Sequence, residues 1–95
     1  MANPIPAKKR IEIYKRDGNS CVICGHPGSE IHHIISAGMG GKRVHELYNM
    51  VTLCNFHHRM AHGESAKDVR NVLKSWSRNV YGGDIDELER RKKGY

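Results

Sequence analysis

The sequence predicts a single small α+β domain over residues 1–95, in which two short strands lie between helices. Three observations indicate this fold class. A chain of 95 residues has room for one core only. Apolar residues recur at helical spacing near both ends, and two short runs rich in Ile, Val and Met lie between them. Closely spaced cysteines and histidines indicate a metal that would stabilise a core of this size.

The first two thirds of the chain carry signals for short elements. In chain order we expect a helix, a tight knuckle, a strand, a glycine-rich loop, a helical turn, a second strand and a helix, over residues 8–16, 21–25, 30–35, 36–42, 44–48, 50–53 and 54–62. Pro6 suits the first turn of the first helix, and Gly18 ends that helix. Ile11 and Tyr14 are expected on its inner face.

A helical extension is expected over residues 66–95. Ser65 and Asp68 resemble a capping box that opens it. The apolar residues that follow at helical spacing predict a core-facing stripe of Val69, Val72, Leu73, Trp76 and Val80. Two glycines at 82–83 break the helix. Acidic residues open the last helix and the basic run 90–93 closes it, which suits the helix dipole.

The chain is basic. Sixteen Lys and Arg against ten Asp and Glu give a net charge of +6, which indicates either a nucleic-acid partner or a basic surface that is only solvated. No run of about eighteen apolar residues is present to span a membrane. The first six residues also lack the apolar stretch of a secretory signal. We therefore expect a cytoplasmic protein that does not act at a membrane, with its three cysteines reduced.

Cys21 and Cys24 are separated by two residues, and the same gap separates Cys54 from His57. Two such pairs, divided by a longer segment, are typical of a tetrahedral structural zinc site, because a two-residue gap lets both side chains of a pair converge on one ion. The alternative is three buried free cysteines beside an unrelated histidine. We expect zinc on these four residues, and its binding would supply folding free energy directly.

A second group of histidines follows a different pattern. His58 and His62 are four residues apart, so on a helix they lie on one face. His32 and His33 are neighbours on a predicted strand and diverge, so one can join the helical pair at a metal while the other faces a substrate. Three histidine ligands leave open positions for water and a phosphate oxygen, which is typical of a catalytic ion.

Two other interpretations of these histidines were weighed. They could form a cluster of ordinary surface or core side chains, which is how we interpret His26 and His45. The helix could instead belong to a zinc protease, but that motif needs a Glu directly after its first histidine, and Arg59 stands there.

These motifs occur in one order along residues 9–62. They are Arg16-Asp17-Gly18, Cys21-x-x-Cys24, Ile31-His32-His33-Ile34, the loop 38–41, Tyr48-Asn49 and Leu53-Cys54-x-x-His57-His58-x-x-x-His62. In this order they resemble the HNH homing-type nucleases, also called ββα-metal nucleases, whose name letters fall on His33, Asn49 and His58. The resemblance implies a zinc-stapled ββα-metal core, with two antiparallel strands and a helix gripping a metal, flanked by N- and C-terminal helices.

The resemblance further implies a metal-dependent endonuclease that hydrolyses DNA phosphodiester bonds through one catalytic divalent ion. By position, His33 resembles the general base that activates water, and Asn49 resembles the residue that keeps this base oriented. His58 and His62 match the metal ligands on the helix. His32 stands where many members carry a metal-binding Asp.

Three positions depart from the family's usual pattern. Because His32 replaces Asp, the catalytic site is all imidazole, which shifts its preference from Mg²⁺ towards Mn²⁺, Ni²⁺, Co²⁺ or Zn²⁺. Ser36 stands where Pro is common, and we expect it only to loosen the loop. His57 stands where a fourth Cys is usual, and we expect it to bind the structural zinc nonetheless.

DNA is the partner that the resemblance implies, with contacts predicted from Lys42, Arg43 and Arg59. No base-reading motif is present, so strong sequence specificity is not expected. Members of the family often occur in bacteriophage genomes. By that analogy, phage DNA-packaging (terminase) proteins are further expected partners, and a bacterial host cell is the expected location.

Two other function classes fit parts of the sequence. A non-catalytic zinc-knuckle module that binds DNA or RNA would need only the four zinc ligands. A protein-interaction domain could use the helix that carries Trp76, alone or together with either of the other functions. Metal counting separates the first two, since the nuclease needs two ions per chain and the knuckle module needs one.

Overall fold

A computed structural model of the chain describes residues 4–36 and 42–92. It has a small mixed α+β architecture. Its elements are α1 (Ala7–Asp17), β1 (Glu30–His33), the short 3₁₀ turn η1 (Leu47–Asn49), β2 (Met50–Leu53), α2 (Asn55–Met60), α3 (Ala66–Tyr81) and α4 (Asp84–Lys92). The predicted helices and strands are present with some shifted ends, but the helical turn expected over residues 44–48 forms later, as η1. The expected loop at 36–42 lies mostly outside the described residues, as does the end of the basic run 90–93.

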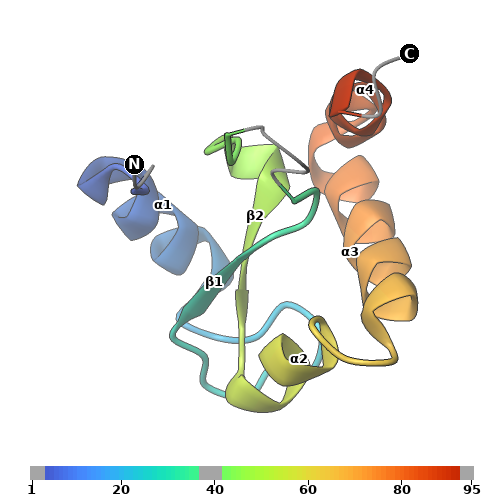
Figure 1. Cartoon of the computed structure of the whole chain (residues 1–95). Helices are drawn as coiled ribbons and strands as arrows, with labels where there is room; N and C mark the ends of the chain where they lie inside the picture. The colour runs from blue at the N-terminus through green and yellow to red at the C-terminus, as the bar shows by residue number, and fades with distance from the viewer. Residues whose placement is uncertain (1–3, 37–41, 93–95) are drawn as a thin grey trace.

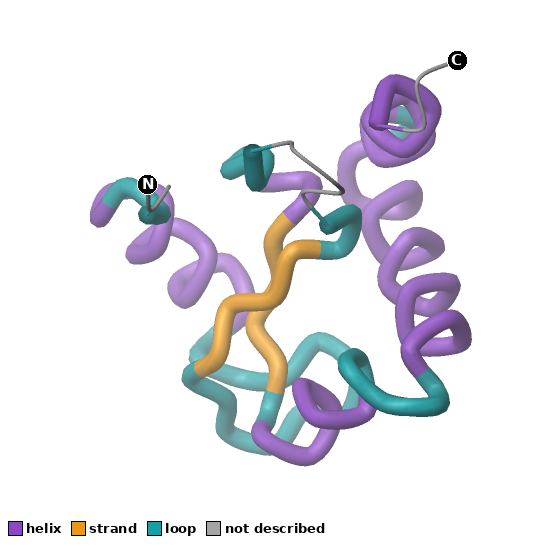
Figure 2. The backbone as a smooth tube through the Cα atoms, viewed as in Figure 1, coloured by secondary structure: helices purple, strands orange, loops and turns teal. Residues whose placement is uncertain are grey.

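The two-stranded sheet lies between the helices (Figure 1). α1 packs against β2 on one side, α3 lies on the other, and α2 closes one end of the hairpin. The connection from α1 to β1 passes beside α2 at that same end (Figure 2). One hydrophobic cluster unites residues of the hairpin with those of α3 and α4. Among the helices described, none combines the length and apolarity that a membrane crossing requires.

β1 and β2 pair in antiparallel register, with Ile31 opposite Thr52 and His33 opposite Met50. β2 is buried along its whole length, whereas β1 is exposed at Glu30 and half-buried beyond it. The more exposed strand of the hairpin is therefore β1, which carries His32 and His33.

The strand predicted over residues 30–35 is two residues too long, because β1 ends at His33. Ile34 and Ile35 are buried, but their backbone N–H groups donate to Asn49, one to its carbonyl and one to its side-chain Oδ1, both at 2.8 Å. The strand ends where Asn49, in place of β2, accepts the backbone hydrogen bonds of the chain. The pattern of apolar residues does not reveal this change of acceptor.

Ile13 is the buried residue of α1, so the predicted inner face of this helix is wrong. Ile11 is 65% exposed, and Tyr14 is half-buried with its hydroxyl bonded to a backbone carbonyl. A polar contact helps to set the rotation of the helix, because Asp17 accepts the backbone N–H of Thr52 on β2 at 3.0 Å. The spacing of apolar residues does not predict this hydrogen bond.

α3 buries a narrower stripe than the sequence predicts. Three of the five stripe residues pack on the core, but Val72 and Val80 are 53% and 52% exposed. A polar residue continues the buried line instead: the hydroxyl of Ser77 donates to the carbonyl of Tyr48 at 2.7 Å. Residues four apart on a helix share a face, and this face follows that spacing.

Two helix ends also differ from expectation. Within the described chain Ser65 makes no side-chain capping hydrogen bond, so the predicted capping box is not formed, and a backbone turn over residues 63–66 opens α3. α2 ends at Met60, two residues early. The N–H of His62 bonds to the carbonyl of Arg59, three residues back, which tightens the final turn.

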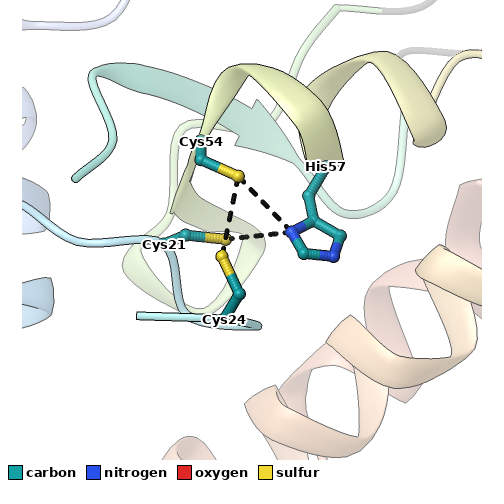
Figure 3. A group of neighbouring side chains, drawn as sticks. All are labelled: Cys21, Cys24, Cys54 and His57. Carbon is teal, nitrogen blue, oxygen red and sulfur yellow. Dashed lines mark hydrogen bonds between the residues drawn. The ribbon is translucent and has the colours of Figure 1, made fainter. Parts of the chain in front are cut away.

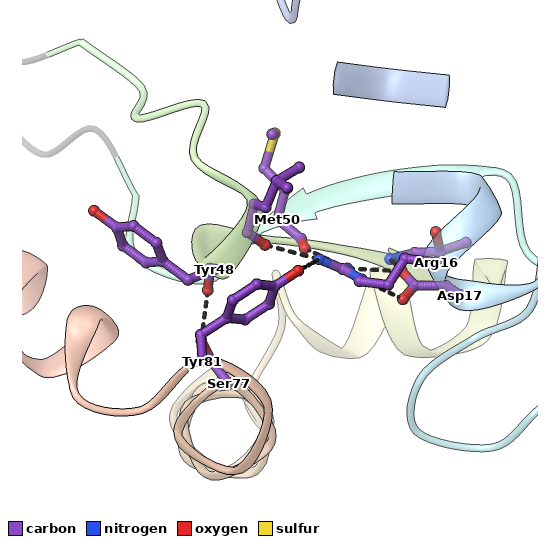
Figure 4. Close-up of polar contacts among 8 residues, drawn as sticks. Arg16, Asp17, Tyr48, Met50, Ser77 and Tyr81 are labelled. Carbon is purple, nitrogen blue, oxygen red and sulfur yellow. Dashed lines mark hydrogen bonds and ion pairs between the residues drawn. The ribbon is translucent and has the colours of Figure 1, made fainter. Parts of the chain in front are cut away.

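An arginine joins α1 to β2 and α3 (Figure 4). The guanidinium of Arg16 donates to the carbonyl of Met50 at 2.7 Å and to the hydroxyl of Tyr81 at 3.1 Å, and lies 4.6 Å from the ring centroid of Trp76. Asp17 balances its charge at 2.7 Å. These contacts fasten the helical extension to the hairpin.

Candidate metal centres and the histidine cleft

Three cysteines and one histidine converge beside the start of α2 (Figure 3). One ligand atom from each of Cys21, Cys24, Cys54 and His57 lies within 4.8 Å of the others, and we call this group the cysteine cluster. The sulfurs of Cys24 and Cys54 are 3.7 Å apart. Nδ1 of His57 lies 3.6 Å from Sγ of Cys21 and 3.4 Å from Sγ of Cys54. The four predicted zinc ligands are therefore together.

These separations match the edges of a metal tetrahedron. Zn–S bonds of about 2.3 Å give sulfur–sulfur edges of about 3.8 Å, whereas the sulfurs of a disulfide are about 2.05 Å apart. All three cysteines are free thiols. Both the donor set and its spacing fit zinc, so these residues can hold the expected structural ion.

Two glycines shape the knuckle that carries the first pair of cysteines. Gly25 has a φ of 79°, in the left-handed region, and its N–H donates to the carbonyl of Cys21 at 2.9 Å, which closes the turn. Gly28 passes so close to β2 that a Cβ would lie 2.7 Å from the carbonyl oxygen of Leu53. This close approach brings the knuckle against Cys54, which precedes α2.

The surroundings of Cys21 favour its thiolate, which is the form that binds zinc. Burial opposes ionisation of Cys21, but hydrogen bonds from the backbone of Cys54, Cys24 and Ile23 lower the pKa of this thiol to about 7. His26 is exposed, and its Nδ1 lies 3.3 Å from Sγ of Cys24. A neighbour of this kind can orient a metal ligand.

His32, His58 and His62 form a second group, which we call the histidine cluster. One ring nitrogen from each lies within 4.8 Å of the other two. The ring centroids of His58 and His62 are 4.9 Å apart. The ring centroid of His32 lies 5.8 Å from that of His58 and 5.4 Å from that of His62. His32 comes from β1, and the other two come from α2 and the turn after it. The structure thus brings the three predicted ligands of a second ion together.

The histidine cluster can offer neutral nitrogen donors. Burial, and then the neighbouring rings of His62, His58 and His33, lower the pKa of His32 to about 4. An imidazole with this pKa is uncharged at neutral pH, and the uncharged form is the metal ligand. Three imidazole donors suit Mn²⁺, Ni²⁺, Co²⁺ or Zn²⁺ and leave further coordination positions open.

His33 follows His32 on β1 but does not belong to the histidine cluster. Its Nε2 lies 2.9 Å from Nδ1 of His45, which is hydrogen-bond distance. Burial, followed by the nearby His45 and Arg43, lowers the pKa of His33 to about 4. The ring is thus uncharged at neutral pH, and a neutral imidazole with one nitrogen engaged can accept a proton on the other.

Two adjoining hollows connect these groups. The larger, about 230 Å³, is bordered by the histidine cluster and His33 and reaches Arg43. The smaller, about 170 Å³, reaches Arg70 on α3. We call the two hollows together the histidine cleft, and the residues that border both of them are His32, His33, Ser36 and His62. Although neighbouring strand residues point to opposite faces, both adjacent histidines border this space.

Asn49 is fully buried behind the cleft. Its side-chain Oδ1 accepts the N–H of Ile35 at 2.8 Å, and its Nδ2 donates to the carbonyl of Val44 at 3.0 Å. Ile35 lies two residues after His33, and Val44 directly precedes His45. The amide therefore fastens together the two segments whose histidines share a hydrogen bond.

The three basic residues predicted to contact DNA occupy different places. Arg43 borders the cleft beside His33. Lys42 is exposed, and its carbonyl accepts a hydrogen bond from Lys92 at 2.6 Å. Arg59 is exposed on α2, and neither it nor Lys42 borders either hollow.

Two residues of the site were missed in the sequence. His45 was interpreted as an ordinary histidine, and only the fold brings its ring to His33. Arg70 lies on a helix for which the sequence predicts core packing or protein interaction, and its neighbour Val69 is indeed buried. Net basic charge was the one sequence signal that bore on Arg70, and it does not single out a residue.

Comparisons with known proteins found no match among family models, curated proteins or solved structures.

Proposed function

We propose that this chain is a metal-dependent HNH (ββα-metal) endonuclease that hydrolyses DNA phosphodiester bonds. The observation that carries the proposal is that three imidazoles with metal-binding spacing share one cleft with a fourth, separately held imidazole. The histidine cluster is the candidate catalytic metal site, and His33 is the candidate general base. Two antiparallel strands followed by α2 are the elements that a ββα-metal unit needs.

A divalent ion on the histidine cluster would neutralise the charge that develops on the scissile phosphate and the leaving 3′ oxygen. His33 accepts a proton from water while the water oxygen attacks phosphorus in line. The bond between phosphorus and the 3′ oxygen breaks, and its electron pair stays on that oxygen, which takes a proton from solvent. The products carry a 5′ phosphate and a 3′ hydroxyl.

His45 has a positioning role in this proposal. We assign the shared proton to Nε2 of His33, which donates it to Nδ1 of His45. His33 then keeps a lone pair on its own Nδ1, and this nitrogen takes the proton from water. The opposite tautomer would carry a proton on Nδ1 and prevent the step. Asn49 supports the pair by fastening both of its flanking segments.

DNA is the proposed substrate because the chain carries a net charge of +6 and Arg43 borders the cleft. Phosphate contacts of this kind do not depend on base sequence. Phage DNA-packaging proteins as partners, and a phage host cell as the location, stay predictions that rest on the family resemblance alone.

The test is supercoiled plasmid incubated with the zinc-loaded protein and, separately, Mg²⁺, Mn²⁺, Ni²⁺, Co²⁺ and Zn²⁺. We expect nicked or linear plasmid, with more product in Mn²⁺, Ni²⁺ or Co²⁺ than in Mg²⁺ because the ligands are imidazoles. Intact plasmid with every ion, from protein that keeps its zinc and its circular dichroism spectrum, would contradict the proposal. DNA binding without cleavage would then favour the zinc-knuckle module.

A further inference from the structure

The histidine cleft has an arginine at each end. Arg43 borders only the larger hollow and Arg70 only the smaller. His32, His33 and His62 border both, so the reactive groups lie between two guanidinium groups. Arg70 belongs to α3, outside the segment that resembles the nuclease family.

The charge of the cleft favours an extended anion. Among the described residues that border the two hollows, none is acidic. Apart from the histidines, the charged side chains on this border are those of Arg43 and Arg70. A single phosphate bound at the histidines would leave the Arg70 end of the cleft positive. A second phosphate beside it would neutralise that charge.

Arg70 differs from two other cations of its helix. Lys74 pairs with Glu89 at 2.7 Å and Arg78 pairs with Asp86 at 2.8 Å, which ties α3 to α4. Within the described residues, the side chain of Arg70 makes no ion pair or hydrogen bond. This guanidinium keeps its donors for a ligand.

The local packing holds Arg70 in place and leaves it accessible. Val69 directly before it is buried in the core, which fixes this turn of α3 against the hairpin, while Arg70 itself is exposed. The other α2–α3 residues on the border of the smaller hollow are His62 and two small side chains, Ala61 and Ala66. Small side chains leave open space between the histidines and the guanidinium.

We propose that Arg70 binds a DNA phosphate that neighbours the scissile one, on the side of the cleft opposite Arg43. A guanidinium can make two parallel hydrogen bonds to phosphate oxygens. The DNA strand then runs across the cleft from α3 to the segment before η1, with the scissile phosphate at the histidines. Which phosphate is scissile rests on the proposed nuclease function. The contact itself does not.

Two substrates distinguish whether Arg70 contacts the scissile phosphate or the phosphate next to it. Bis(p-nitrophenyl) phosphate is a phosphodiester with no neighbouring phosphate, whereas a duplex oligonucleotide has one on each side. Arg70→Gln is expected to lower kcat/KM on the oligonucleotide about tenfold, as for loss of one charge-assisted hydrogen bond, and to leave the small diester unchanged. Arg91→Gln is the control, since it makes the same charge change on α4 and Arg91 borders neither hollow.

Two outcomes in an active protein would overturn the inference. Equal losses on both substrates would assign Arg70 to the scissile phosphate. Unchanged rates on both substrates would show that Arg70 does not contact the bound DNA.

Duplex binding, followed by fluorescence anisotropy without added divalent ion, tests the contact independently of cleavage. Arg70→Gln is expected to reduce the slope of log K against log salt by about 0.9, the value for one neutralised phosphate, while Arg91→Gln leaves the slope unchanged. If the wild-type chain cut neither substrate, the proposed function would fail and this slope would still decide the contact. An unchanged slope in Arg70→Gln overturns the inference.

Discussion

The cysteine cluster and the histidine cluster share a helix but differ in chemistry. His57 and His58 are neighbours on α2, and a helix turns by about 100° per residue, so one ring joins three sulfurs and the other joins two imidazoles. The cysteine cluster has four donors, including thiols, and can close a tetrahedron around its ion. The histidine cluster has three imidazole donors, and its residues border a cleft. From this difference we propose that an ion in the cysteine cluster would hold the fold, while an ion in the histidine cluster would stay open for chemistry.

Breaking the cysteine cluster should have the largest effect. Structural zinc contributes on the order of 10 kcal/mol in small peptides, which is comparable to the roughly 5–15 kcal/mol of net stability of a whole domain. Cys54→Ala, or removal of zinc by a chelator, should therefore abolish most folded structure in far-UV circular dichroism. His58→Ala changes a ligand of the other cluster on the same helix and should keep the fold. An unchanged spectrum and melting temperature in Cys54→Ala would show that the cluster is not a structural site.

Removing the candidate base should slow cleavage without disturbing either cluster. His33→Ala is expected to stay folded, to bind both ions and DNA, and to cleave plasmid at least about 10²-fold more slowly, the lower limit for general-base catalysis. His32→Ala should instead lose affinity for the second ion. If the metal titrations of the two variants were exchanged, the roles of His32 and His33 would be inverted. Wild-type cleavage rates in both would end the nuclease proposal.

Removing one ligand from the histidine cluster should weaken only the binding of the second ion. His62→Ala should keep zinc and the fold, and its affinity for Mn²⁺ or Ni²⁺ in calorimetric titration should fall by more than the roughly 10- to 100-fold expected for loss of a ligand's supporting partner. His26→Ala removes a histidine beside the cysteine cluster and should leave that affinity unchanged. Equal affinities in His62→Ala and wild type would make His62 a neighbour of the ion and not a ligand.

The smallest effect is expected at His45, which contacts neither ion in this assignment. His45→Ala should lower kcat about tenfold, the value of one lost hydrogen bond, with little change in KM for DNA or in metal affinity. His45→Gln keeps a side-chain acceptor and should recover part of the rate. ¹⁵N shifts of the His33 ring provide the direct check: wild type should show the tautomer protonated at Nε2, and protonation at Nδ1 would rule out the positioning role.

Local spacing made much of the candidate site predictable. Pairs with a two-residue gap predicted the cysteine cluster, and the four-residue gap between His58 and His62 predicted a shared helix face. β2 was predictable because Met50–Leu53 is a short, mostly apolar run that contains the β-branched residues Val51 and Thr52. Each of these features depends on residues close together in the sequence.

The remaining features depend on contacts between distant residues. The rotation of α1 involves a bond between Asp17 and Thr52, and the end of β1 is set by Asn49. His45 reaches His33 only after the two strands have paired. Arg70 borders the cleft because α3 folds back beside α2. The periodicity of the sequence does not predict these long-range contacts.

Counting bound metal in one chain tests the difference between the clusters most directly. The zinc-loaded protein is dialysed to equilibrium against Ni²⁺, and both metals are measured per chain by elemental analysis. We expect one zinc and one nickel in wild type, and one zinc without nickel in His62→Ala. A single bound ion per wild-type chain would contradict the two-site assignment and leave a zinc-stapled binding module in its place.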